Sequence, residues 1–227
     1  PIAYYGSSNL GVFKRIYRNG LSQRYGRMMQ TISGVHYNYS VPDSIWQSSL
    51  FKNIDTDSRE VRSSAYFNML RNIYRINWLI LYLFGASPIL TRSFLTEDNQ
   101  SFKQLDKQTL FLPYATSLRM SNFGYQNTRR KKLEVSINSM AEYVSDLRKA
   151  TNTTHSEFAK IQTKNMKLQA QINENILQID DEYYAVARAK SKIISDKRTT
   201  TKLNQSGVDF IELRSLDLNP FSRIGID

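Results

Sequence analysis

The segment Val208-Asp-Phe-Ile-Glu-Leu-Arg214 alternates in the manner of a β-strand with one apolar and one polar face. In an extended chain Ile211 and Leu213 point to one side, whereas Phe210, Glu212 and Arg214 point to the other. A carboxylate and a guanidinium on one strand face are able to hold a cation and a phosphate side by side. The same pair also fits an exposed salt bridge on a solvated sheet, which is common, and the segment alone favours that interpretation.

A second strand is predicted upstream, over residues 28–41, where it ends at Pro42. Alternation puts Val35, Tyr37, Tyr39 and Val41 on one face, and Gln30, Ile32, His36 and Asn38 on the other. Neutral imidazole is a good ligand for divalent metals, and a neighbouring amide suits a polar substrate. A lone histidine is more often structural, and His155 lies in a polar run far along the chain. Spacing alone leaves both roles open for His36.

Apolar side chains at helical spacing predict helices over residues 9–25, 63–84 and 138–150. The second half of the middle helix is apolar nearly all round, which predicts a deeply buried end before Gly85. Asn138 is the expected N-cap of the third helix.

Further extended segments are predicted over residues 172–190 and 208–216. Helices and strands follow one another in mixed order, so we expect an α+β fold with a largely antiparallel sheet. Helices packed on the outer face of such a sheet leave its other face free for a ligand. The 227 residues, 41% of them hydrophobic, suffice for one domain with a core.

The net charge is +11, from 31 Lys and Arg against 20 Asp and Glu, which favours polyanionic partners such as nucleic acid or nucleotide phosphates. Tyrosines beside arginines and the run Arg129-Arg-Lys-Lys132 are compatible with a basic nucleic-acid-binding domain. No helix-turn-helix, RNP-like or zinc-finger pattern accompanies them, and the basic run is better explained as a solvated loop. Nucleic-acid binding is therefore the alternative rather than the first hypothesis.

No segment fits a membrane span or a covalent catalytic motif. The longest apolar run, residues 76–86, is shorter than the roughly 20 residues that a bilayer crossing needs. The chain has no cysteine, which removes thiolate metal sites and is compatible with a reducing cytoplasm. P-loop, GxGxxG and nucleophile-elbow patterns are absent, which leaves metal-assisted phosphoryl or acyl-phosphate chemistry open.

Ten strings or residue pairs, in order along nearly the whole chain, carry a family resemblance. They are Tyr5-Gly-Ser-Ser-Asn9, Arg24-Tyr-Gly26, Met29-Gln-Thr-Ile-Ser-Gly-Val-His-Tyr-Asn38, Tyr82-Leu-Phe-Gly-Ala-Ser-Pro88, Leu112-Pro-Tyr-Ala-Thr-Ser-Leu-Arg119, Gly124-Tyr125, Gln178-Ile179, Glu182 with Tyr184, Ile211-Glu-Leu-Arg-Ser-Leu-Asp217 and Asn219-Pro-Phe-Ser222. Together they resemble the proteobacterial type of glutamate–cysteine ligase. Several long strings in one order are a specific signal, unlike any single short motif.

The resemblance implies a fold related to glutamine synthetase: a curved antiparallel sheet that forms a funnel, with helices outside and metals at its narrow part. It implies ATP-dependent ligation of L-cysteine to the γ-carboxylate of L-glutamate through a γ-glutamyl phosphate, the first step of glutathione biosynthesis. The expected cofactor is Mg²⁺, with Mn²⁺ as a substitute, and the expected location is the cytoplasm. Neither nucleic acid nor a membrane is an expected partner, and the sequence gives no indication of the oligomeric state. A related ligase that uses another amine is a weaker alternative.

The resemblance also implies residue roles, position by position. His36 and Glu212 correspond to metal ligands, Arg214 to a contact of the transferred phosphate, and Arg119 to a contact of the substrate or its phosphorylated side chain. Gln30 and Ile32 would line the glutamate site, Tyr125 and Tyr184 would hold the carboxylate of cysteine, Tyr17 and Leu21 would shape its thiol pocket, and Arg188 and Lys190 would meet ATP.

Family members are more than twice this length and carry, upstream of the position of Pro1, a glutamate-rich strand that completes the metal cluster. Residues 1–227 are therefore expected to form the central part of a single catalytic domain, without that strand and without a C-terminal region. The positive charge then reflects a missing anionic half of the site, and we expect the chain alone to be inactive.

Overall fold

The computed structural model describes residues 2–95, 101–121, 123, 133–161, 169–193 and 197–226. The α-helices are α1 (Asn9–Tyr25), α2 (Asp43–Trp46), α3 (Arg59–Phe84), α4 (Met140–Asn152) and α5 (Thr199–Ser206). Short 3-10 helices are η1 (Met28–Thr31), η2 (Ser49–Phe51), η3 (Arg92–Phe94), η5 (Phe158–Lys160) and η6 (Asp180–Glu182). The strands are β1 (Gly34–Tyr39), β2 (Ile89–Thr91), β3 (Lys103–Gln104), β4 (Thr109–Phe111), β5 (Ala187–Lys190) and β6 (Phe210–Asp217).

The described strands form two sheets. The central sheet has the order β1-β6-β5 and the second sheet has the order β2-β4-β3. All pairings between these strands are antiparallel, so the predicted α+β class with antiparallel pairing is confirmed. The sequence does not predict the second sheet, because its strands of two or three residues are too short to show alternation.

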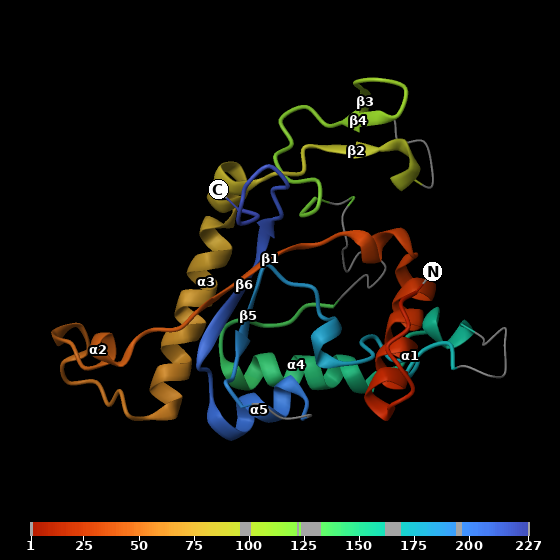
Figure 1. Cartoon of the computed structure of the whole chain (residues 1–227). Helices are drawn as coiled ribbons and strands as arrows, with labels where there is room; N and C mark the ends of the chain where they lie inside the picture. Colours follow the sequence, from red (N-terminus) through yellow and green to blue (C-terminus); the bar gives the residue numbers. More distant parts are fainter. Residues whose placement is uncertain are drawn as a thin grey trace.

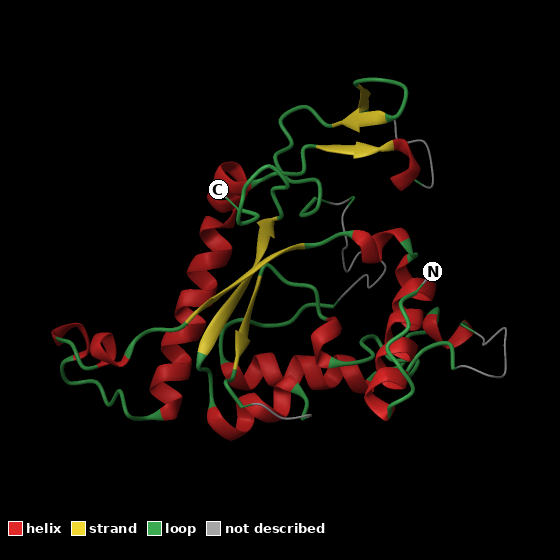
Figure 2. Cartoon of the chain, in the orientation of Figure 1, coloured by secondary structure: helices red, strands yellow, loops and turns green. Residues whose placement is uncertain are grey.

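Helix α3 covers one face of the central sheet, and α4 and α5 close its lower end (Figures 1 and 2). Phe67 and Leu70 of α3 are fully buried in one core with Ile211 of β6. Leu147 of α4 and Leu203 of α5 belong to the same core. The opposite face of the sheet carries the polar side chains of β5 and β6, as a sheet covered on one side by helices requires.

A bulge in β6 changes which residues share a face of the central sheet. Tyr37 pairs with Leu213, and Gly34 pairs with Asp217, so three steps along β1 correspond to four along β6. The strand β6 therefore contains one extra residue. Strict alternation would place Asp217 on the core face, and the extra residue turns it to the polar face that carries Glu212.

The strand β1 is shorter than predicted. It begins at Gly34 rather than at residue 28, because its partner β6 ends opposite it at Asp217. The preceding residues form η1, in which the backbone N–H of Gln30 donates to the carbonyl of Arg27 at 3.1 Å. The prediction that Gln30 and Ile32 lie on this strand is therefore wrong.

Only the end of the predicted strand 172–190 is extended, as β5. Before it, side chains and the backbone at the end of α4 supply hydrogen-bond partners in place of a regular strand ladder. The Gln178 side chain accepts from the N–H of Ile172 at 2.9 Å, and the Glu182 carboxylate accepts from the N–H of Gln178 at 2.6 Å. Such local acceptors compete with strand pairing and hold an irregular chain in place.

The C-terminal half of α3 is exposed, so the prediction of a deeply buried end is wrong for this structure. Ile76 is 50% exposed, Trp78 is 68% exposed and Tyr82 is 70% exposed. The first half of the helix buries its stripe against the central sheet, and the described part of the chain leaves these later side chains uncovered. Among the described residues, no helix combines the length and the apolar character that a bilayer crossing requires.

The helix boundaries otherwise follow the sequence closely. Helix α1 matches the predicted range 9–25. Helix α3 begins earlier than predicted because the Ser58 hydroxyl accepts from the N–H of Val61. The N-cap of α4 is Ser139, whose hydroxyl accepts from the N–H of Glu142 at 3.2 Å, and not its neighbour Asn138.

Candidate active site

A cavity of about 590 Å³ opens on the polar face of the central sheet. Its walls come from α1, η1, β1, η6, β5 and β6, segments that are far apart in the sequence. The lining residues are Tyr17, Arg18, Leu21, Met29, Gln30, Ile32, Ser33, Gly34, His36, Arg119, Asp181, Glu182, Tyr184, Arg188, Lys190, Glu212 and Arg214. We call it the sheet cavity.

Glu212 has cationic or imidazole nitrogens beside both of its oxygens. Its Oε2 lies 3.0 Å from Nη1 of Arg214 and 3.9 Å from Nζ of Lys190. Its Oε1 lies 3.5 Å from Nδ1 of His36. Burial alone would raise the pKa of Glu212, but Lys190 and Arg214 outweigh it and hold that pKa below the ordinary value. The carboxylate is therefore ionised at neutral pH.

His36 is held in its neutral form. Burial lowers the pKa of His36, and the nearby Arg214 guanidinium lowers it further, while Glu212 opposes both. A neutral imidazole keeps a lone pair that a metal ion can share. Its Nδ1 also lies 3.4 Å from Nη1 of Arg214, so the two cavity residues are in direct contact.

Three cations stand together on the polar face of β5 and β6: Arg188, Lys190 and Arg214. The Arg188 side chain is only 6% exposed, and it lies opposite Glu212 in the strand register. The Nε atoms of Arg188 and Arg214 are buried and have no hydrogen-bond partner among the described residues. Asp181 offsets part of this charge through Lys190, at 3.0 Å. Clustered guanidinium and ammonium groups with unused donors suit an anion that carries several oxygens.

The Arg119 guanidinium donates most of its hydrogen bonds to other groups of this chain. Its Nε donates to Asp217 Oδ1 at 2.7 Å, and its Nη2 donates to the carbonyls of Arg214 at 2.9 Å and Leu216 at 2.8 Å. Its Nη1 donates to the Tyr184 hydroxyl at 3.2 Å. Among the described residues one N–H of Nη1 keeps no acceptor, and Arg119 lines the sheet cavity.

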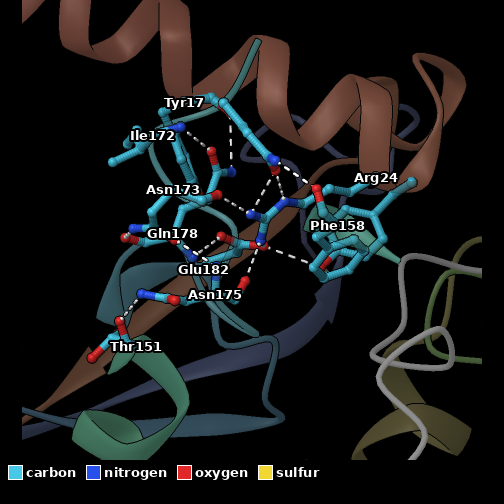
Figure 3. Close-up of polar contacts among 11 residues, drawn as sticks. Tyr17, Arg24, Thr151, Phe158, Ile172, Asn173, Asn175, Gln178 and Glu182 are labelled. Atoms are coloured by element: carbon cyan, nitrogen blue, oxygen red, sulfur yellow. Dashed lines mark hydrogen bonds and ion pairs between the residues drawn. The ribbon is translucent and has the colours of Figure 1, made fainter. Parts of the chain in front are cut away.

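Helix α1 forms the wall that carries Tyr17 and Leu21, and a buried network fixes that helix. Figure 3 shows the Arg24 guanidinium pointing from α1 toward Glu182, with the Phe158 ring beside it. Arg24 Nη1 lies 3.4 Å from Glu182 Oε1, and both side chains are fully buried. The guanidinium carbon lies 4.2 Å from the centre of the Phe158 ring.

The same network continues to the backbone on both sides. Arg24 donates to Gln171 Oε1 at 2.9 Å from Nε, and to the carbonyl of Asn173 at 2.6 Å. The other Glu182 oxygen accepts from the N–H of Gln178, so η6 and α1 share one buried carboxylate. Because Tyr184 follows two residues after Glu182, the network sets the distance between the α1 wall and the Tyr184 wall of the cavity.

His36 and Glu212 are suited to two of the ligand positions of a metal site. His36 and Glu212 present a neutral nitrogen and an ionised oxygen to the same cavity, which is a chemically suitable donor pair for a divalent ion. Among the described residues, however, no three His, Cys, Asp or Glu side chains gather as a metal-binding group. A complete site requires further oxygen ligands from elsewhere.

The sheet cavity brings together the predicted residues His36, Glu212, Arg214, Arg119, Gln30, Ile32, Tyr17, Leu21, Tyr184, Arg188 and Lys190. Tyr125 and the run Arg129–Lys132 lie outside the described residues. Arg188 and Lys190 share a face of β5, whereas Tyr184 reaches the same cavity from an irregular segment before β5.

Comparison with known proteins gives a match to the family described as glutamate-cysteine ligase over residues 1–227. The chain belongs to the glutamate–cysteine ligase family. It is 47% identical over 228 residues to the glutamate–cysteine ligase of Aliivibrio salmonicida, covering all of this chain and 44% of that protein. It is 45% identical over 230 residues to the ligase of Pseudomonas entomophila, covering 43% of it. The chain thus spans less than half the length of these relatives.

Solved structures agree with this assignment. The Francisella tularensis glutamate–cysteine ligase in complex with AMP superposes with a TM-score of 0.88 at 40% identity, over 99% of this chain and 44% of that one. A bifunctional glutathione synthetase from Pasteurella multocida gives a TM-score of 0.64 at 24% identity, over 98% of this chain and 24% of that one. The second likeness shows the fold alone.

Sequence reasoning on this member of the ligase family missed several cavity residues. Arg18 and Met29 neighbour predicted residues, and Asp181 and Glu182 precede Tyr184 by a few positions. Glu182 belongs to one of the strings that carry the resemblance, yet a lone carboxylate in an irregular segment gives no sign of its buried partner Arg24. Only the tertiary structure reveals that pair.

Proposed function

We propose that the enzyme to which this chain contributes joins L-cysteine to the γ-carboxylate of L-glutamate and converts ATP to ADP and phosphate. The observation that carries the proposal is the sheet cavity, which collects from distant segments every predicted site residue that the structure describes. Membership of the glutamate–cysteine ligase family supports the substrates. The AMP complex of the Francisella tularensis relative supports an adenine nucleotide as one of them.

The charge distribution of the cavity fits a phosphoryl transfer. A triphosphate and a carboxylate repel each other, so a ligase must neutralise both before they react. Arg188, Lys190 and Arg214 supply three positive charges on one sheet face, with unused donors on the two guanidiniums. We assign Arg188 and Lys190 to the ATP phosphates and Arg214 to the phosphoryl group in transfer.

The reaction proceeds in two balanced steps. A γ-carboxylate oxygen of glutamate attacks the terminal phosphorus of ATP, an O–P bond forms, and ADP leaves. The amine nitrogen of cysteine then attacks the acyl carbon, the C–O bond breaks, inorganic phosphate leaves, and the nitrogen loses a proton. In this scheme Gln30 and Ile32 line the glutamate position, and Arg119 binds the substrate or its phosphorylated side chain.

The amino-acid end of the cavity has the mixed character that cysteine requires. Leu21 is 4% exposed and gives an apolar wall for a thiol, next to Tyr17 on the same helix. The N–H of Arg119 Nη1 that has no acceptor among the described residues gives a donor for a carboxylate, and the Tyr184 hydroxyl, which accepts from Arg119 and donates to Met120 Sδ at 3.2 Å, lies beside it. Tyr125, outside the described residues, is assigned to the same carboxylate.

Magnesium is the proposed metal, and His36 and Glu212 are its proposed ligands in this chain. A divalent ion there would screen the negative charge of the phosphates and of the reacting carboxylate. The remaining ligands are assigned to carboxylates outside residues 1–227, in keeping with our proposal that the chain forms the central part of one catalytic domain.

An isotope experiment on a full-length enzyme that carries these residues tests the proposal. L-Glutamate labelled with ¹⁸O in its γ-carboxylate is incubated with L-cysteine, ATP and Mg²⁺. We expect γ-glutamylcysteine, ADP and inorganic phosphate that carries one ¹⁸O, because the substrate oxygen leaves with the phosphate. Product without label in the phosphate would exclude the acyl phosphate, and no product would exclude the ligase activity.

A further inference from the structure

We propose that Asp217 is a positioning residue, which holds Arg119 at the amino-acid end of the sheet cavity, where Arg119 Nη1 donates to the Tyr184 hydroxyl. The proposal rests on the function proposed above, since it gives this end of the cavity a substrate carboxylate to bind. It assigns a role to a residue that lies behind the cavity wall and is absent from its lining.

Asp217 is buried and fully bonded. It is 2% exposed, and its Oδ1 accepts from Arg119 Nε at 2.7 Å and from the Ser117 hydroxyl at 3.0 Å. Its Oδ2 accepts from the Ser87 hydroxyl at 2.7 Å and from the N–H of Ala86 at 3.0 Å. A carboxylate with four donors from two segments, residues 86–87 and 117–119, has a single orientation, and it passes that orientation to Arg119.

The bulge in β6 makes this contact possible. Without the extra residue, Asp217 would face the apolar core, where an ionised carboxylate is very costly. With it, Asp217 faces the same side of the sheet as Glu212 and lies opposite Gly34.

Gly34 provides the space for the guanidinium. A Cβ on Gly34 would lie 2.6 Å from Cζ of Arg119 and 2.7 Å from the carbonyl oxygen of Leu216. The planar guanidinium therefore packs directly on the backbone of β1, where only a glycine leaves room. Asp217 at one edge and Gly34 on one face together fix its position.

The result is a guanidinium with one edge committed to the protein and one edge directed at Tyr184. Nε and Nη2 are used by Asp217 and two backbone carbonyls, and Nη1 reaches the Tyr184 hydroxyl. A substrate carboxylate meets an arginine that is already held in place, so little conformational entropy is lost on binding. The binding of one amino-acid substrate should therefore depend on Asp217, and the binding of ATP should not.

The test compares Asp217→Asn and Gly34→Ala with Asp209→Asn in a full-length enzyme that carries these residues. Asp209 is the matched control, because it lies just before the other end of β6 and accepts from the N–H of Lys192. For Asp217→Asn and Gly34→Ala we expect the KM of one of the two amino-acid substrates, L-glutamate or L-cysteine, to rise at least tenfold. The KM of ATP should change less than twofold. A merely structural role would lower the amount of active enzyme and would not change one KM value more than the other.

A second readout separates this proposal from the proposed function. In the 227-residue chain, the Nε–H proton of Arg119 should give a slowly exchanging NMR signal that Asp217→Asn removes and Asp209→Asn retains. Unchanged KM values in a folded Asp217→Asn or Gly34→Ala enzyme, or an Arg119 signal that survives Asp217→Asn, would overturn the positioning role and leave the ligase activity standing. A wild-type enzyme without ligase activity would instead overturn the proposed function, and with it the substrate assigned to Arg119.

Discussion

Nη1 of Arg214 lies 3.0 Å from Oε2 of Glu212, and the two side chains are 17% and 15% exposed. They stand two residues apart on one face of β6, and His36 of β1 contacts both. An ion pair on a solvated surface contributes little, but this pair lies in a cavity that Arg188 and Lys190 also line. The geometry favours the functional interpretation that the strand pattern alone did not.

Replacement of Arg214 or Glu212 should therefore change the reaction rate more than the free energy of unfolding. In a full-length enzyme, we expect Arg214→Ala and Glu212→Gln each to lower kcat by about 10²–10³, as for other groups that stabilise transition-state charge. The exposed pair Arg59 and Glu60, at 2.9 Å, provides the control. Arg59→Ala should change kcat less than twofold, and an equal loss in all three variants would contradict the assignment.

The buried pair of Arg24 and Glu182 should matter for stability. Arg24→Met leaves the Glu182 carboxylate without its cation, and we expect a loss of about 3–5 kcal/mol in the free energy of unfolding, measured with urea. Arg15→Met, on the exposed side of the same helix, should change it by less than about 0.5 kcal/mol. Glu182→Gln added to Arg24→Met should recover part of the loss, and strict additivity would contradict a direct interaction.

Acid should weaken the contribution of Asp181. Burial raises the pKa of Asp181, but Lys190, Arg188 and Thr199 outweigh it and hold that pKa below its ordinary value of 3.8. The ionised carboxylate therefore stabilises the fold at pH values above the ordinary pKa. This stabilisation is lost as pH falls through the lowered pKa. The difference in unfolding free energy between wild type and Asp181→Asn should be constant from about pH 7 to 5 and shrink below about pH 4. A difference that grows on acidification would show that the sign is wrong.

The two tryptophans should report on the exposed end of α3. Trp46 is 4% exposed and Trp78 is 68% exposed. Acrylamide should quench the fluorescence of the 227-residue chain in two components, and Trp78→Phe should remove the accessible one. A chain whose tryptophans are equally protected would mean that the apolar side of α3 is covered in solution.

The isolated chain should be unable to make γ-glutamylcysteine. Its proposed metal ligands are His36 and Glu212, and its described residues contain no third His, Cys, Asp or Glu beside them. We therefore expect Mn²⁺ to bind the chain weakly, with His36→Ala abolishing what binding there is. Product formation with ATP, glutamate, cysteine and Mg²⁺ would refute this expectation.

Local sequence patterns predicted α1, α3, α4 and the polar face of β6, but not the shorter helices α2 and α5. Helical spacing gave α1 within its bounds, and alternation put Glu212 and Arg214 together because a strand has period two. Resemblance to the ligase family supplied the roles of residues such as His36, whose spacing left two interpretations open. Periodicity involves residues that are neighbours in the chain, and family resemblance involves whole segments. Both can therefore be identified from the sequence alone.

The tertiary structure decided everything that depends on distant partners. The end of β6 fixed where β1 begins, Trp78 is left exposed by the described residues, and Arg24 met Glu182 across more than half of the chain. The bulge turned Asp217 to the polar face against the alternation of its own strand. Register, burial and ion pairing arise from contacts between segments, so the sequence determined which side chains are available and the fold determined which of them meet in the cavity.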